Sequence, residues 1–436
     1  MKKRYDESAK GMWGRATPIA DGSHPNLFYN RDEIIELREM VLVRHTPQKL
    51  YDLYHSEIKG SMAEPAPDGA PETGKGHNIH FINCSAALSY MFEPNEKKAA
   101  AILAALRSFL RAFPDGLFHL GNRKNPEWNA RACIAEEDKI VDWYHSFEAF
   151  NGMSLAWIFD LIQGLHPEMI VPEERIQIKE WFRKSAQPLK YISEKRIGGP
   201  LQWSIDGDSG DPKITREGKT ISGYANWWSR DLMPSLACAF VSGSQEEVDF
   251  WADSGWPHEM LTADGYTEDY PPLTCNYFDM VMYLLAVFPS GANYDTYTRE
   301  GYNHEDGTWH TNAYTAEGGA YHWAQMIGVM LGAEMAYHNG MTGVFEITDA
   351  GEPAILRVCK RAIESRTERD LQPKNLSGHP RIGYDSSLML GYRRYADPVL
   401  EDAISDVAPY AGFDVRDTVL EFMGYPRRIV WPNKNI

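Results

Sequence analysis

Apolar residues recur along most of the chain at spacings of three and four, a pattern typical of amphipathic helices. The predicted helices cover residues 32–42, 82–93, 95–113, 141–163, 173–191, 225–242, 246–256, 275–288, 319–338, 352–365 and 383–395. Alternation with a period of two, which marks half-buried strands, is scarce. The pattern therefore predicts an all-α protein.

Local signals place some of the helix ends. Asn30 is predicted to be the N-cap of the first helix, since Glu33 and Glu36 follow where the helix dipole favours acids. The Phe113-Pro114-Asp115-Gly116 segment is predicted to end the helix before it. Irregular stretches are expected at 60–80, 114–138, 192–224, 257–274 and 289–318. Such long loops in a helical domain are usually functional walls or lids.

The predicted helices follow one another in pairs, with Gly- and Pro-rich connections and no break in composition between them. This arrangement favours one layered domain over residues 1–436, with an irregular segment at 1–30. A closed or incomplete ring of helical hairpins, an (α/α) toroid, fits it best.

Composition narrows the class of partner. The formal net charge of -17 argues against nucleic acid, which requires a basic face. An acidic glycan remains compatible, because a cleft can be locally positive. The local field could come from Arg123, Lys124, Arg131 and Arg230. Many of the 13 Trp and 23 Tyr residues lie in polar segments such as 224–228, where rings can stack on sugars, although most single aromatics are expected in the core.

The remaining composition excludes several classes. No run of 18 apolar residues is present, so a membrane span is not expected. The five cysteines are odd in number and lack a CxxC pair, which favours buried free thiols over zinc or disulfides. The charged residues 1–10 fit either a cytoplasmic protein or a periplasmic or secreted one whose signal has been removed.

Residues suited to catalysis lie at or near two predicted helix starts. Asn226-Trp227-Trp228-Ser229-Arg230 opens one helix, and Asp264-Gly265-Tyr266-Thr267-Glu268-Asp269-Tyr270 leads into another that begins near Tyr277. Cleavage of a uronate polymer by β-elimination needs groups that neutralise the carboxylate and a base that removes the adjacent proton. Asn226 and Arg230, four residues apart, suit the first task, and Tyr277, with Tyr270 as second choice, suits the second.

These segments resemble the alginate lyase-like polysaccharide lyases of the chondroitin AC/alginate lyase type, whose fold is an incomplete (α/α) toroid. Asn226-Trp227-Trp228 is similar to the family's Asn-His-x-x-Trp segment, and Asp264 to Glu268 with Tyr277 is similar to its Asp-Gly-x-x-x-Glu motif ahead of the catalytic tyrosine. More generic likeness comes from Ser85–Ala99 and from the helix Ala320–Ala336. The resemblance implies a polysaccharide lyase acting on alginate, polymannuronate or glucuronan, without an organic cofactor but with room for a structural divalent cation.

Two departures from the family pattern shape the residue assignment. Trp227 replaces the family histidine, and Pro271 and Pro272 replace the arginine before the tyrosine. Charge neutralisation is therefore assigned to Asn226 and Arg230, with His145 or His322 as further candidates. The missing histidine favours elimination on one face by a single tyrosine, which corresponds to β-D-mannuronate or β-D-glucuronate. The expected substrate-binding residues are Trp227, Trp228, Trp143, Tyr270, Glu268, His322, Tyr321, His310 and Arg299.

Three other interpretations stay open. Asp264, Glu268 or Asp269, with Glu136, Glu137 or Asp142, could form the acid and base of a glycoside hydrolase. Trp227, Trp228 and Trp143 could form the platform of a non-catalytic carbohydrate-binding protein. Residues 206–211 with Glu217 superficially match a calcium loop, but a solvated acidic turn is the default. His304, His310 and His322 lack metal-site spacing.

Overall fold

The computed structural model describes residues 14–45, 48–66, 75–114, 116–117, 144–197, 202–205, 212–216, 219–222, 225–254, 330–346, 348–349, 352–353, 355–357, 359–360 and 391–405. This part of the chain is mainly helical, which confirms the predicted helical class. The chain forms two compact units. The first unit comprises Met1–Ala16, Arg196–Leu232 and Asp249–Tyr410, and the second comprises Thr17–Lys195, Met233–Val248 and Ala411–Ile436. The single domain stays a prediction.

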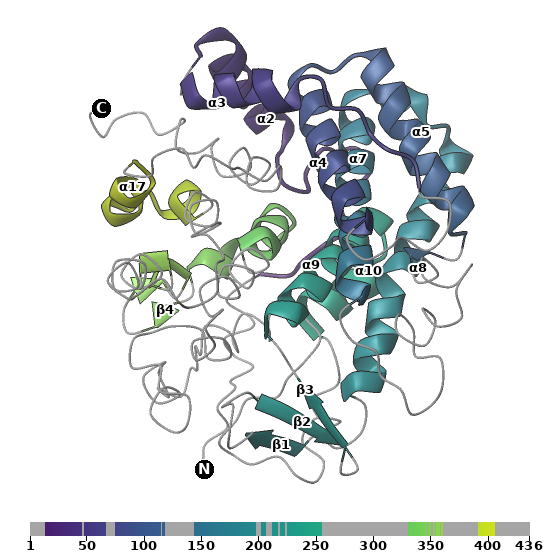
Figure 1. Cartoon of the computed structure of the whole chain (residues 1–436), viewed down its shortest axis with the longest axis vertical. Helices are drawn as coiled ribbons and strands as arrows, with labels where there is room; N and C mark the ends of the chain where they lie inside the picture. The colour runs from purple at the N-terminus through teal and green to yellow at the C-terminus, as the bar shows by residue number, and fades with distance from the viewer. Residues whose placement is uncertain are drawn as a thin grey trace. The chain divides into compact units, whose positions relative to one another are not determined.

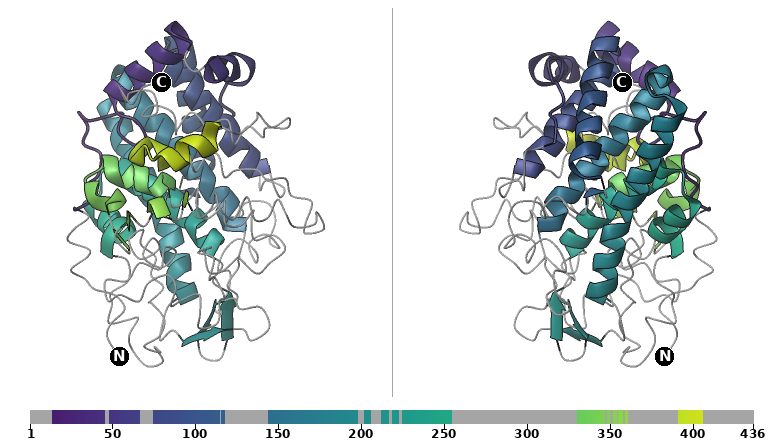
Figure 2. Two further views of the ribbon diagram at one scale, coloured as in Figure 1. Left: turned by 90° about the vertical axis from the view of Figure 1, so that its left-hand side faces the viewer. Right: turned by 90° about the vertical axis from the view of Figure 1, so that its right-hand side faces the viewer.

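The second unit is a set of packed helices (Figure 1). They are α2 (Arg31–Arg38), η1 (Glu39–Val43), α3 (Gln48–Leu53), η2 (Tyr54–Ile58), α4 (Lys75–Phe92), α5 (Glu96–Ala112), α7 (Tyr144–Leu165), η4 (Pro167–Met169), α8 (Pro172–Ile197), the second half of α9 (Ala225–Ser242) and α10 (Gln245–Val248). The views of Figure 2 show α4, α5 and α7 side by side, and α4 and α7 share the most extensive contact among the described helices.

Several predicted helix ends are confirmed. Asn30 caps α2 through a capping box, in which its side chain accepts from the N–H of Glu33 and the Glu33 carboxylate accepts from the N–H of Asn30. Helix α5 ends at Ala112, before the predicted stop. Gly116 has φ +91°, and a Cβ there would lie 2.9 Å from the Ser185 nitrogen, so this turn requires glycine.

The core of the second unit consists of large aromatic and aliphatic side chains along the helix interfaces. Trp157 of α7 meets Phe28 edge to face, with ring centroids 5.6 Å apart, and both rings are buried. Phe159 and Phe182 join α7 to α8 at 5.5 Å. Gly152 lets α7 approach α9, because a Cβ there would lie 3.0 Å from Cys238 Sγ.

The first unit combines helices with two small antiparallel sheets. Strands β1 (Gln202–Ile205), β2 (Pro212–Arg216) and β3 (Lys219–Ser222) form a three-stranded sheet in sequence order. Its other elements are the first half of α9, η5 (Asp249–Ser254), a helix ending with residues 330–338, η7 (Thr342–Phe345), β4 (Thr348–Asp349), β5 (Glu352–Pro353), a helical segment at 391–395 and α17 (Pro398–Ser405).

Some predicted boundaries are wrong. The stretch 192–224, expected to be irregular, contains the end of α8 and the β1–β3 sheet. The stretch 60–80 was also expected to be irregular, but α4 begins at Lys75. Helices α3 and α17 were not predicted, because each is short and presents too few apolar repeats for a periodic signal.

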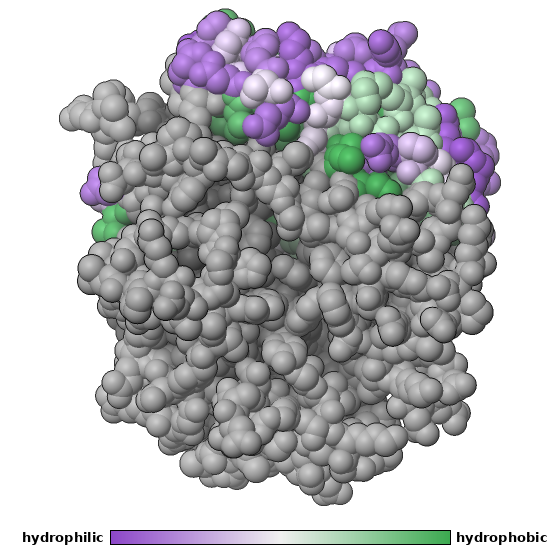
Figure 3. Space-filling model, in the orientation of Figure 1, coloured by the Kyte–Doolittle hydropathy of each residue, from purple (hydrophilic) through white to green (hydrophobic). Residues whose placement is uncertain are grey.

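The described surface around α2 and α3 is mostly hydrophilic, with smaller hydrophobic areas (Figure 3). Ile35 of α2 and Val43 of η1 are large exposed apolar side chains in this region, and single exposed residues of this kind are normal on protein surfaces. None of the described helices combines the length and apolar character needed to cross a membrane.

Candidate functional site

Three of the four predicted catalytic residues, Asn226, Arg230 and His145, lie near the starts of two helices whose backbone is described. Helix α9 begins at Ala225, so Asn226, Trp227 and Trp228 occupy its first turn and Arg230 lies in the second. Helix α7 begins at Tyr144, so His145 lies in its first turn. The predicted start at residue 225 is confirmed, whereas α7 begins at Tyr144, three residues after the predicted start at 141. No side-chain position of these five residues is described.

The first turn of α9 has a chemical property that follows from its backbone alone. The first N–H groups of a helix lack intrahelical acceptors, and the helix dipole adds partial positive charge there. Asn226 and Arg230 are four residues apart in one continuous helix, which places them on one face about 6 Å apart along the axis. An anionic group is favoured at such a position.

The C-terminal part of the same helix contains Pro234. Proline has no N–H, so the carbonyl of Arg230 loses its usual helical donor. A Cβ built on Gly152 of α7 would lie 3.8 Å from the Pro234 ring, and the helix beyond it is buried from Met233 to Val241. The C-terminal half of α9 is thus held in the core of the second unit.

The other predicted site residues lie outside the described residues. These are Tyr277, Trp143, Tyr270, Glu268, His322, Tyr321, His310 and Arg299. The same holds for the acids of the hydrolase alternative, which are Asp264, Asp269, Glu136, Glu137 and Asp142. Their grouping around Asn226 stays a prediction.

The possible calcium loop, residues 206–211 with Glu217, lies outside the described residues, and the structure describes only the strands that flank it. Residues 206–211 connect Ile205 to Pro212, which pair with each other at one end of the β1–β2 ladder. Glu217 follows Arg216, which pairs with Lys219 at the opposite end of β2. Among the described residues, no group of three metal-binding side chains is present.

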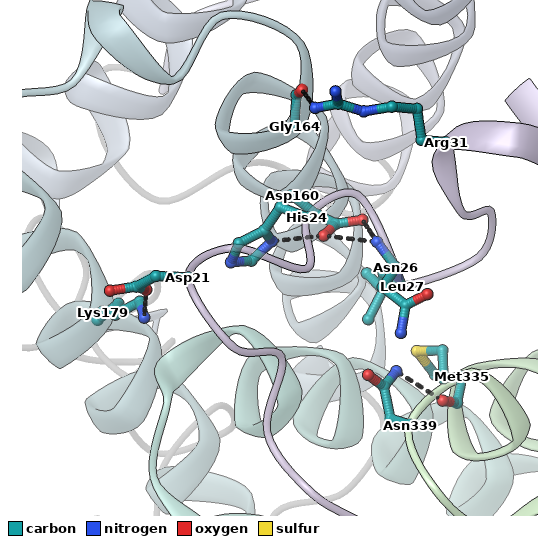
Figure 4. A network of polar contacts seen from close by, with 10 residues as sticks. All are labelled: Asp21, His24, Asn26, Leu27, Arg31, Asp160, Gly164, Lys179, Met335 and Asn339. Carbon is teal, nitrogen blue, oxygen red and sulfur yellow. Dashed lines mark hydrogen bonds and ion pairs between the residues drawn. The ribbon is translucent and has the colours of Figure 1, made fainter. Parts of the chain in front are cut away.

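A buried histidine–carboxylate pair, not predicted from the sequence, ties the N-terminal segment of the second unit to α7 (Figure 4). His24 Nδ1 lies 2.6 Å from Oδ1 of Asp160, and both side chains are essentially inaccessible to solvent. The N–H groups of Asn26 and Leu27 donate to the same carboxylate at 3.0 and 2.9 Å. His24 Nε2 has no hydrogen-bond partner in the described part of the chain.

Asp160 orients the His24 imidazole, as in a catalytic pair, but a polymer cannot reach the buried ring. A general base must come within hydrogen-bond reach of its substrate, whereas the His24 side chain is 0% exposed and its ring packs edge-on against Phe159. Arg31 Nη2 donates to the Gly164 carbonyl at 2.6 Å, and Lys179 pairs with Asp21 on the same segment. Residues 19–31, the strap, are therefore anchored to α7 and α8 by structural contacts.

The first unit contains a second buried charge cluster. Arg394 forms a two-point ion pair with Glu334, with Nε 2.6 Å from Oε1, and Arg393 Nη1 lies 3.5 Å from Oε2. Burial alone would raise the pKa of Glu334, but the two guanidinium groups hold that pKa below its ordinary value. The Arg394 guanidinium also lies 3.7 Å from the Tyr337 ring centroid. The cluster joins residues 330–338 to residues 391–395.

Each buried cluster contains an acid that stands out in the sequence. Asp160 is the one charged residue within the apolar run 151–165, and Glu334 is the one acid within 330–338. An unpaired charge in a buried helix is too costly to persist, so each of these acids predicts a buried partner. The sequence does not identify the partner, since His24 is 136 residues from Asp160.

Two titratable groups buried along α4, the Tyr90 phenol and the Cys84 thiol, have pKa values raised by burial. Burial raises the pKa of the Tyr90 phenol, which makes a 2.6 Å hydrogen bond with His166 Nδ1. Burial likewise raises the pKa of the Cys84 thiol, 3.8 Å from His80 Nε2, so Cys84 is not an activated nucleophile. Cys84 and Cys238 are free and buried, which confirms the expectation for these two thiols.

Comparison with protein-family models finds no match to this chain, and comparison with curated protein sequences finds none either.

Proposed function

We propose that the protein is a polysaccharide lyase with an incomplete (α/α) toroid that cleaves a uronate polymer by β-elimination. The observation that supports this most is the start of α9 at Ala225. It gives Asn226 and Arg230 one helical face near N–H groups that lack intrahelical acceptors and near the positive end of the helix dipole. An amide, a guanidinium and a helix start together suit a carboxylate.

The reaction begins with binding of the uronate carboxylate by Asn226 and Arg230. The extra charge of the enolate-like intermediate is then stabilised more than that of the ground state. The ionised Tyr277 takes the proton from C5, and the C–H electron pair forms the C4=C5 double bond. The C4–O bond breaks, and the leaving oxygen takes the proton back from Tyr277. Both proton transfers occur on one face, as in β-D-mannuronate or β-D-glucuronate.

The remaining residues have supporting roles in the proposal. Trp227, Trp228 and Trp143 stack on flanking sugars, and His145 adds positive charge when protonated. Tyr270, Glu268, His322, Tyr321, His310 and Arg299 line the substrate path. No organic cofactor takes part in this scheme.

The test compares the products formed from polymannuronate, glucuronan, polyguluronate and hyaluronan. Elimination creates a conjugated double bond that absorbs in the ultraviolet, whereas hydrolysis creates reducing ends without it. A Tyr277→Phe variant should lose activity by about a thousandfold or more, because its acid and base are removed. Tyr90→Phe is the matched control, since Tyr90 lies buried in α4 and should leave the rate unchanged. New reducing ends without absorbance would instead support the hydrolase, and binding without cleavage would support the carbohydrate-binding protein.

A further inference from the structure

Three basic side chains gather around one carboxylate where the strap lies along α8. Lys179 pairs with Asp21, and Arg175 is four residues before Lys179, on the same face of the helix. The hydrogen bond from Lys179 is the main reason why the pKa of Asp21 lies below its ordinary value. The charges of Arg175 and His24 add to this effect, so both side chains lie near the same carboxylate.

Two nitrogen atoms in this cluster are buried without a hydrogen-bond partner. Arg175 Nε and His24 Nε2 have none among the described residues. The other ring nitrogen of His24, Nδ1, lies 2.6 Å from Asp160. Figure 4 shows the His24 ring between Asp160 and the Asp21–Lys179 pair, with Nε2 on the side of that pair. Buried polar groups normally have a partner, so an unpartnered one points to a bound water or ion.

The charges of the cluster decide which ligand fits. Arg175 and Lys179 carry two positive charges, and Asp21 supplies one negative charge. The Asp160 carboxylate lies beyond the ring, where His24 Nδ1 and two backbone N–H groups already bind it. A divalent cation would be repelled by the guanidinium and the ammonium group. These two groups are instead the usual donors to phosphate and carboxylate oxygens, so the cluster favours an anion.

The cluster is open to solvent at one end. The side chains of Asp21 and Lys179 are 58% and 18% exposed, whereas that of His24 is fully buried. The His24 ring packs edge-on against Phe159 and closes the inner end. An anion that replaces Asp21 at Lys179 therefore enters from the solvent side, and it has to be small to come near His24.

We propose that Arg175, Lys179 and His24 form a binding site for a small oxyanion, such as inorganic phosphate or the carboxylate of a single uronate. The anion replaces Asp21 as the partner of Lys179 and accepts a hydrogen bond from Arg175 Nε. His24 donates to it through Nε2 once the imidazole is protonated. The bound anion then links the strap to α8 in place of the Asp21 ion pair. The proposal does not depend on the lyase reaction.

Calorimetric titration of the whole chain with sodium phosphate, at constant ionic strength and with chloride as the reference anion, tests this site. We expect a Kd of about 1 mM for the parent protein. Arg175→Gln should raise the Kd by about tenfold, because a charged donor is lost. Arg183→Gln is the matched control on α8, since its guanidinium is already paired with Glu180 at 2.7 Å. The control should change the Kd by less than about twofold.

A second variant should change the affinity in the opposite direction. Asp21→Asn removes the carboxylate that competes for Lys179, so the Kd for phosphate should fall by about threefold or more. Arg175→Gln breaks no hydrogen bond of Nε, so its melting temperature should stay within about 2 °C of the parent value. A change in anion affinity without a change in stability separates binding from a structural role.

Three results would overturn the site. They are a parent protein that binds phosphate and glucuronate no better than chloride, an equal rise in Kd in Arg183→Gln, and weaker binding by Asp21→Asn. Titration with sodium glucuronate identifies the source of the oxyanion. Binding of phosphate alone supports a site for free phosphate, and binding of glucuronate alone supports a site for a sugar carboxylate. None of these measurements depends on cleavage, so failure of the lyase proposal would leave them unaffected.

Discussion

Replacing Asp160 by Asn should release the strap from α7. The carboxylate accepts hydrogen bonds from His24 at 2.6 Å and from the N–H groups of Asn26 and Leu27 at 3.0 and 2.9 Å, all in the interior. An amide offers one acceptor oxygen and turns an N–H₂ group toward a donor, so at least one buried donor loses its acceptor. Each such loss costs about 1–3 kcal/mol, and together with the lost charge we expect about 3 kcal/mol.

Two assays test this prediction: hydrogen exchange of peptides that cover the strap, and urea unfolding of the whole protein. A loss of about 3 kcal/mol should accelerate exchange at Asn26 and Leu27 by about a hundredfold when they exchange through local opening. Asp52→Asn is the control, since Asp52 is exposed and accepts one hydrogen bond from Gln48 at 2.8 Å. The control should change stability by less than about 0.5 kcal/mol. An Asp160→Asn effect below about 1 kcal/mol would refute the proposed anchoring.

Other predictions test the two units separately. The lowered pKa of Glu334 contributes stability above the ordinary glutamate pKa of about 4.3, and this contribution is lost as pH falls through the folded-state value. The melting temperature of Glu334→Gln should therefore fall less than that of the parent protein as the pH is lowered through the acidic range. An identical pH dependence of the two melting temperatures would contradict the ion-pair assignment. Gly164→Ala should destabilise the protein by about 2–3 kcal/mol, because the added Cβ would overlap Pro25. Gly22→Ala is the control, since a Cβ on Gly22 meets nothing within 4 Å. Equal melting temperatures of the two Ala variants would argue against the close contact. Native alkylation followed by peptide mapping should spare the buried thiols, which are Cys84, Cys238 and Cys359. Burial raises the pKa of Cys359 to about 12, so modification of that thiol in the folded protein would contradict its placement.

The sequence predicted those elements whose signals are local. The capping box at Asn30 and Glu33 depends on residues three apart, so its pattern is visible without tertiary structure. Helix α9 was predicted with the observed bounds, because its apolar spacing continues to Ser242 despite Pro234. The first two turns of α9, with Asn226 and Arg230, are therefore predictable from the sequence.

The missed features depend on pairing between distant residues or on short elements. The β1–β3 sheet has strands of four or five residues with turns rich in Gly and Asp, too short for a clear period of two. The pairing of His24 with Asp160 crosses 136 positions, and no local pattern encodes it. Tertiary contacts alone determine such partners, which is also why the position of Tyr277 relative to Asn226 stays a prediction.

The most direct test of the lyase proposal is ultraviolet absorbance during incubation with polymannuronate or glucuronan, comparing the parent protein with Tyr277→Phe and Tyr90→Phe. The proposal predicts that absorbance of a conjugated double bond rises with the parent and the Tyr90→Phe control but not with Tyr277→Phe. Flat absorbance with the parent on every uronate polymer, or an undiminished rate in Tyr277→Phe, would contradict it.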